Sequence, residues 1–147
     1  MTDLVVVDTV VLQKANAPVS GDVNTRSKFA KRLKLLAGLR DRRLTVLISE
    51  KLLAEYRKQI PTPRNDYLKA FFELLAYPGV AVRNWSSWSG YNRSHAAGCR
   101  FPREDYHVLR TAICQAGATI LSEEHRMLVT DKCIHRKLNV HVIDPTT

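Results

Sequence analysis

Carboxylates follow two of the apolar segments of this sequence, at the points where a buried strand would end. Asp8 comes directly after the apolar run 4–7, and Glu123 and Glu124 come just after the apolar run 118–121. Short, continuous, β-branched runs are typical of strands in a parallel sheet. Because the carboxyl ends of parallel strands share one edge of the sheet, we expect these acids to lie near one another.

Two further acids belong to predicted helices. Glu55 comes six residues after Ser49, which is suited to cap a helix, and Asp105 lies in the first turn of a helix that begins near Pro102. Clustered carboxylates repel one another unless a cation lies between them, and Mg²⁺ and Mn²⁺ bind oxygen ligands of this kind. Together the acids predict a site for a hard divalent cation.

Each acid also has a structural explanation that needs no shared site. These are a helix cap for Asp8, a favourable position in the helix dipole for Glu104 and Asp105, a surface position beside Arg57 or Lys58 for Glu55, and a cap after Ser122 for Glu123 or Glu124. Capping does not require acids at two separate strand ends of one sheet, so we favour the shared site.

Five short apolar segments are predicted to be strands that alternate with helices. They are residues 4–7, 44–48, 80–82, 118–121 and 140–143. The alternation predicts one α/β domain over residues 1–147, a three-layer α/β/α sandwich around a mainly parallel sheet. In such sheets, binding sites form beyond the carboxyl ends of the strands.

Helical patterns lie between most of these strands. We expect a basic amphipathic helix over 26–43, helices over 50–60 and 64–76, a helix from Pro102 to a C-cap at Gly117, and a short helix at about 123–128. These helices would carry Glu55 and Asp105 toward the edge of the sheet where Asp8 lies.

Residues 84–101 are rich in Ser, Gly and aromatic residues and have no clear period, so we interpret them as a loop insertion. Trp85, Trp88 and Tyr91 lie there, close to arginines. Such rings could stack on unpaired RNA bases. The tryptophans could equally fill the core or a dimer contact, as most large aromatic side chains do.

The chain is strongly basic. It has 23 Lys and Arg against 14 Asp and Glu, a formal net charge of +9. An excess of this size favours a polyanionic partner such as nucleic acid, although a generally basic surface is the alternative. The basic residues that flank the predicted site in sequence are Arg93, Arg100, Arg103, Arg110, Arg126 and Lys132.

Cys99, Cys114 and Cys133 are odd in number and lack CxxC spacing. That pattern favours reduced thiols in a cytoplasmic protein over a disulfide framework. His95 and His135 lie near Cys99 and Cys133, but no second pair completes a structural zinc motif, so we do not expect zinc. The acidic, interrupted N-terminal segment does not have the pattern of a signal peptide, and no apolar run is long enough to span a membrane.

The order of several short motifs resembles that of PIN-domain ribonucleases, and most closely the small, single-domain VapC-like toxins. The motifs are "VVVDT", "LISEKLLAEY", "PREDYHVLRTAI", "GATILSEEHRML" and "LNVHVIDP". The resemblance covers nearly the whole chain except about 83–101. Each motif is short, and their combination in this order carries the likeness.

The resemblance implies site residues position by position. The first-strand Asp of the family corresponds to Asp8, followed by the hydroxyl residue Thr9, and the helix Glu corresponds to Glu55. The Asp ahead of the next conserved helix corresponds to Asp105, with Glu104 as a lesser alternative.

The last family motif, usually Thr-x-Asp, is replaced here by Ser122-Glu123-Glu124. Glu124 then corresponds to the acid and Ser122 to the hydroxyl residue. Because Glu is one methylene longer than Asp, its carboxylate would have to fold back or bind through water. Glu123 and Asp131 are the alternatives for this position.

The activity implied is hydrolysis of phosphodiester bonds in RNA with Mg²⁺ or Mn²⁺ held by Asp8, Asp105 and Glu124, while Glu55 completes the catalytic set. The likeness further implies a homodimer and a small antitoxin protein that binds the toxin. Two alternatives stay open: a PIN nuclease in RNA processing or defence, and a non-catalytic PIN-like module that binds RNA or protein.

Overall fold

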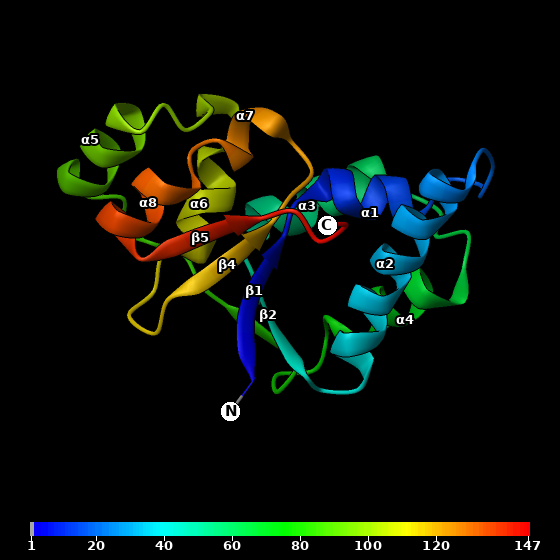
Figure 1. The fold of residues 1–147 in the computed structure, drawn as a ribbon. Helices are drawn as coiled ribbons and strands as arrows, with labels where there is room; N and C mark the ends of the chain where they lie inside the picture. The colour runs from blue at the N-terminus through cyan, green and yellow to red at the C-terminus, as the bar shows by residue number, and fades with distance from the viewer. Residues whose placement is uncertain (1) are drawn as a thin grey trace.

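The structure of the protein is a computed structural model that describes residues 2–147. It contains a five-stranded, entirely parallel sheet in the order β3-β2-β1-β4-β5 (Figure 1). The strands are β1 (Asp3–Val7), β2 (Leu44–Ile48), β3 (Ala81–Arg83), β4 (Ala118–Leu121) and β5 (Val140–Ile143). The predicted strands and the parallel sheet are confirmed.

Helices cover both faces of the sheet and complete the predicted three-layer α/β/α sandwich. They are α1 (Thr9–Ala15), α2 (Val23–Arg40), α3 (Glu50–Gln59), α4 (Asp66–Leu74), α5 (Gly90–Gly98), the short 3₁₀ helix η1 (Arg103–Asp105), α6 (Tyr106–Ala112), α7 (His125–Leu128) and α8 (Asp131–Leu138). In Figure 1, α1, α2 and α4 lie to the right of the strands, whereas α5, α6 and α8 lie to the left.

The strand order places the start of the chain at the centre of the sheet. The chain builds outward from β1 through β2 to β3 and then returns to place β4 on the other side of β1. The order therefore reverses between β1 and β4, and ligand sites of open parallel sheets form at such a reversal. Val7 is paired with Leu121 there, so the residues that follow both strands emerge side by side.

The core explains why β1 is held firmly in place. Val5, Val6 and Val7 are all buried, as expected for a central strand with helices on both faces. Tyr56 of α3 is fully buried and donates a hydrogen bond from its hydroxyl to the carbonyl of Val7. The last residue of β1 is thus fixed immediately before Asp8.

Three helices differ from the sequence-based expectation. α1 and α8 are real helices that we did not predict, and α5 occupies half of the segment interpreted as a loop over 84–101. Ser89 starts α5 by accepting a hydrogen bond from the Asn92 amide. Only Ala96 of this helix is buried, so its sequence has almost no apolar periodicity to reveal it.

The predicted helix from Pro102 to Gly117 is shorter than expected. η1 opens it, and α6 ends at Ala112, because the Asn84 side-chain amide donates hydrogen bonds of 2.8 Å to the carbonyls of both Thr111 and Ile113. Gly117 is not a C-cap. It has a φ of 76° in the turn before β4, where a Cβ atom would lie 2.9 Å from the Asn139 side chain.

The cysteine prediction was wrong for two of the three thiols. Cys99, at the end of α5, is bonded to Cys133 in α8 with a Cα–Cα distance of 5.6 Å, whereas Cys114 is free. Neither sequence spacing nor composition reveals that α5 and α8 pack together. No helix within residues 2–147 is long and apolar enough to cross a membrane.

Candidate functional site

Asp8 and Ser122 meet where the strand order reverses. The Ser122 hydroxyl donates a 2.8 Å hydrogen bond to Oδ2 of Asp8, and both side chains are buried. The backbone amide of Asp8 donates to the carbonyl of Leu121, which continues the β1–β4 pairing by one residue. Through this contact Ser122 orients the Asp8 carboxylate.

The electrostatic environment of Asp8 is unusual for an aspartate. Burial raises its pKa to about 7, although the hydrogen bond from Ser122 acts in the opposite direction. The negative charges of Asp105, Glu124 and Glu55 raise the pKa further. These are the acids that the sequence predicted to converge, and the structure places them within electrostatic range of one another.

Glu55 is held from two sides. The Thr9 hydroxyl donates a hydrogen bond to Oε1 of Glu55, and Nε2 of the buried His107 lies 2.8 Å from Oε2. The His107 contact is the main reason why the pKa of Glu55 lies below its usual value, and Thr9 contributes in the same direction. Glu55 is therefore an ionised carboxylate with a fixed orientation.

A chain of hydroxyl groups fixes α3 against α6 and so places His107 beside Glu55. Ser49 caps α3 and lies 2.8 Å, oxygen to oxygen, from the hydroxyl of Thr111 in α6. Thr111 in turn donates to the carbonyl of His107 at 2.7 Å. No role for His107 was predicted from the sequence, although its position two residues after Asp105 is a signal that points to it.

Asp105 lies at the junction of η1 and α6 and is partly buried. Burial raises its pKa to about 6, and the charges of Glu104, Glu124 and Glu55 add to the rise. Glu104 is exposed and forms an ion pair with Arg126, so its carboxylate is already neutralised on the surface. This contact favours Asp105 over Glu104 as the third acid.

Glu123 and Glu124 have different surroundings. Glu123 receives hydrogen bonds from Arg32 at 2.8 and 2.7 Å, and Lys14 lies 3.6 Å away. Glu124 forms no ion pair among residues 2–147, and its backbone amide donates to the Ser122 hydroxyl at 3.1 Å. Asp131 accepts a hydrogen bond from the Val142 amide and contacts His141. Of these acids, only Glu124 acts on the pKa of Asp8.

The acids have the chemistry of a divalent-cation site, but they are not gathered as a finished set of ligands. Their oxygens are the donors that Mg²⁺ and Mn²⁺ prefer. Burial is the main cause of the raised pKa values of Asp8 and Asp105, and the neighbouring carboxylates add to both. Within residues 2–147, no group of three or more His, Cys, Asp or Glu is positioned to hold a metal ion. The donor atoms fit a hard cation in type, but they are not assembled around one point.

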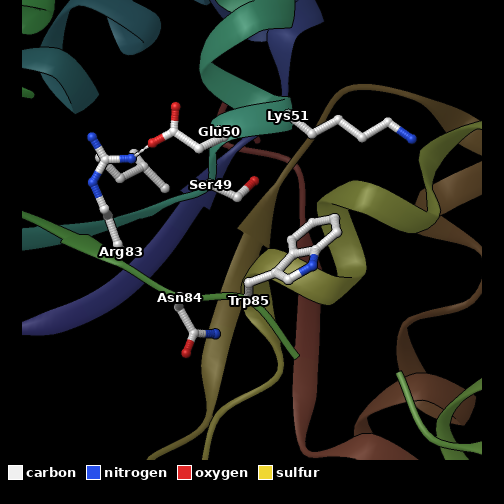
Figure 2. A pocket seen from close by; sticks show the side chains of 7 residues that line it. Ser49, Glu50, Lys51, Arg83, Asn84 and Trp85 are labelled. Carbon is white, nitrogen blue, oxygen red and sulfur yellow. Dashed lines mark ion pairs between the residues drawn. The ribbon is translucent and has the colours of Figure 1, made fainter. Parts of the chain in front are cut away.

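A groove of about 600 Å³ lies at the carboxyl ends of β2 and β3. Figure 2 shows Trp85 and Lys51 on one side of the groove and the ion pair between Glu50 and Arg83 on the other. Ser49, the cap of α3, lies between them. None of Asp8, Glu55, Asp105 and Glu124 lines the groove, so it is separate from the candidate acids.

Arg110 holds the segment that carries both tryptophans. Its guanidinium donates hydrogen bonds of 3.1 and 2.8 Å to the Ser86 carbonyl and lies 3.9 Å from the centre of the Trp85 ring. Trp85 is 45% exposed, whereas Trp88 is half-buried against Tyr106. Trp85 therefore presents much of its ring to the surface, whereas Trp88 packs on the domain with one part of its ring and stays partly exposed.

No protein-family model, curated protein or solved structure matches this chain.

Proposed function

We propose that the protein is a metal-dependent endoribonuclease that works in the manner of PIN-domain ribonucleases. The observation that carries the proposal is the buried Asp8 carboxylate at the reversal of strand order, whose pKa is raised toward 7 in the company of three other acids. A strongly perturbed acid in such a position is typical of a functional site. The resemblance of the motif order supports the same assignment.

In this proposal, Mg²⁺ or Mn²⁺ bound by Asp8, Asp105 and Glu124 would supply a water of lowered pKa and offset charge on the phosphate. Ser122 keeps the Asp8 carboxylate in one orientation through its hydrogen bond. Thr9 and His107 contact the two carboxylate oxygens of Glu55 and fix its orientation, so that it would complete the catalytic set beside the metal ligands.

RNA binding must come from cations around the acids, because carboxylates repel phosphate. The net charge of +9 supplies an attractive field, which predicts binding that weakens steeply with salt. Arg126 and Arg110 are already engaged by Glu104 and by the Ser86 carbonyl. Arg93, Arg100 and Arg103, the other arginines that flank the site in sequence, are exposed and are therefore the better candidates for phosphate contacts.

Cleavage of total RNA with mapped ends tests the proposal. The parent should cut with Mn²⁺ and stop on addition of EDTA, and Asp8→Asn and Glu124→Gln should lose activity by at least about a hundredfold. Asp41→Asn is the matched control, because Asp41 is an exposed acid at the other end of β2. If Asp8→Asn cut RNA as fast as the parent, the assignment would be wrong.

A non-catalytic module that binds RNA or protein is the second candidate. It is favoured by one observation: within the described residues the acids do not form a preassembled metal cluster. This candidate predicts RNA binding without cleavage and without thermal stabilisation by Mn²⁺. A toxin role, an antitoxin partner and a homodimer are proposals that rest on the motif resemblance, and light scattering of the purified chain tests the dimer directly.

A further inference from the structure

A second pocket, distinct from the groove beside β2, lies between α5 and the start of α6. Its volume is about 600 Å³, and its lining includes Trp88, Phe101, Tyr106 and the arginines Arg93, Arg100 and Arg103. We call it the arginine pocket. Most of its lining residues come from the segment 84–101, the part of the chain that the motif resemblance does not cover, and Arg103 and Tyr106 follow just after it.

The aromatic residues form a packed base for the arginine pocket. Phe101 is buried, and its ring centre lies 6.3 Å from that of Tyr106. The Trp88 and Tyr106 rings are 5.1 Å apart and tilted by 51°. Trp88 and Tyr106 both keep partial exposure, so each offers aromatic surface to an occupant. Volumes of this size accommodate a nucleotide.

The cations of the pocket are available to a ligand. Arg93, Arg100 and Arg103 are exposed, and none of them forms an ion pair within residues 2–147. The acid nearest in sequence, Glu104, is held by Arg126 instead. Three unneutralised guanidinium groups around one pocket favour a phosphate, which arginine binds in a bidentate manner.

The walls of the pocket are held in place before any ligand arrives. Trp88 and Arg100 both adopt positive φ angles, 57° and 62°, which non-glycine residues rarely adopt. Cys99, next to Arg100, is tied to α8 by the disulfide. The disulfide restrains the backbone around Arg100, and a binding site with a restrained backbone loses less conformational entropy when it is occupied.

We propose that the arginine pocket binds one unpaired nucleotide of the RNA substrate, its phosphate between the arginines and its base against Trp88 and Tyr106. Aromatic surface beside guanidinium groups suits a nucleotide better than an acidic peptide, which would use the charges alone. Asp105 lies between Arg103 and Tyr106 in the chain, so a strand held here would lead toward the acids. The inference rests on the proposed ribonuclease function and adds a subsite to it.

The first experiment measures binding of a fluorescein-labelled oligouridylate by anisotropy, with EDTA present to prevent cleavage. Arg93→Gln/Arg103→Gln should weaken binding roughly tenfold or more. It should also reduce the slope of log affinity against log salt by about 0.7, the value for one phosphate contact on a single strand. Arg42→Gln/Arg43→Gln removes the same charge at the amino end of β2 and should match the parent.

The second experiment uses the protein's own fluorescence. The chain has two tryptophans, so Trp85→Phe leaves Trp88 as the sole reporter. Oligouridylate should quench its emission with the midpoint seen by anisotropy. Uridine monophosphate should compete weakly, because it lacks the neighbouring nucleotides that contact the rest of the basic surface. Equal competition by the mononucleotide would show that the pocket takes a free nucleotide and overturn the strand assignment.

Two outcomes separate this inference from the ribonuclease proposal. Equal binding of oligouridylate by Arg93→Gln/Arg103→Gln and by its control would refute the arginine pocket as an RNA subsite. Displacement of the RNA by oligoglutamate as readily as by oligouridylate would refute it too. Neither result would bear on whether the protein cleaves RNA. If the parent bound RNA through these arginines but never cut it with Mn²⁺, the ribonuclease proposal would fail and the binding site would stand.

Discussion

Arg32 and Glu123 form a buried, two-point ion pair that joins α2 to the end of β4. Nε and Nη2 of Arg32 lie 2.8 and 2.7 Å from the two carboxylate oxygens, and both side chains are less than 10% exposed, at 9% and 6%. The carboxylate of Glu123 is thus occupied by an ion pair that stabilises the fold. The carboxylate of the adjacent Glu124 forms no ion pair among residues 2–147 and is available to the candidate site.

The first prediction separates these neighbouring glutamates by stability. Glu123→Gln leaves the Arg32 charge buried without a full partner and should lower the free energy of unfolding by roughly 3 kcal/mol. Glu124→Gln should change it by about 0.5 kcal/mol or less and should abolish cleavage. Urea denaturation and an RNA cleavage assay on both variants measure the two effects. If Glu124→Gln lost the stability and Glu123→Gln lost the cleavage, Glu123 would be the acid of the site and Glu124 the structural one.

Metal binding should appear as thermal stabilisation. At a Mn²⁺ concentration a hundred times its dissociation constant, the folded state gains about 2.7 kcal/mol, which for a chain of this size raises the Tm by roughly 5–10 °C. Asp8→Asn should remove the response because it removes a central ligand, and Asp41→Asn should retain it. Differential scanning fluorimetry with a Mn²⁺ titration gives the answer, and an equal response from Asp8→Asn would argue against a site at Asp8.

The raised pKa of Asp8 makes the metal-free protein sensitive to pH. Since the folded pKa is about 7 and the ordinary value is 3.8, the folded state holds a proton that the unfolded state releases between these values. The Asp8 contribution to stability therefore falls as pH rises from about 4 to 7. The Asp8→Asn variant has no carboxyl group at this position, so it does not lose stability in this way as pH rises.

In EDTA, Asp8→Asn should consequently be more stable than the parent, by a margin that grows between pH 5 and pH 8. Each unit of the shift corresponds to about 1.4 kcal/mol, so a Tm difference of several degrees is expected at pH 8. Asp105 titrates in both proteins, so its contribution largely cancels in the difference between their stabilities. A margin that is the same at both pH values would show that Asp8 is not protonated in the folded state.

The disulfide gives a prediction that is independent of the acids. Alkylation of the native protein without reductant should label Cys114 alone, and all three cysteines should react after reduction and unfolding. Cys99→Ser/Cys133→Ser should lose about 2–4 kcal/mol of unfolding free energy, with Cys114→Ser as the control. Labelling of all three cysteines in the native state would mean that the bond does not form under those conditions.

The sheet could be predicted from sequence because each strand is a short, continuous apolar run, a signal that is local. The helix α1 could not, because it continues the apolar character of β1, through Val10 to Leu12, and its sequence shows little helical pattern. The helix α8 was overlooked although its sequence does carry a helical pattern. Ile134 and Leu138 lie one turn apart on its buried face, among charged residues.

The candidate acids were predictable for a related reason. A carboxylate that directly follows a buried strand is visible in the sequence, as Asp8 is. The choice between Glu123 and Glu124 was not visible, because it depends on Arg32, a residue 91 positions away that reaches across from α2. His107 was overlooked for the same reason, since its role depends on how α6 lies against α3.

The pairing of Asp8 with Ser122 has a consequence for the protein during its own synthesis. The two residues are 114 positions apart, and Glu124 follows two residues later. At about 5–20 residues per second, a ribosome needs roughly 6–23 s to pass from Asp8 to Glu124. Throughout that interval the nascent chain carries the first acid without its partners, so the proposed site cannot assemble until nearly the whole chain has been made.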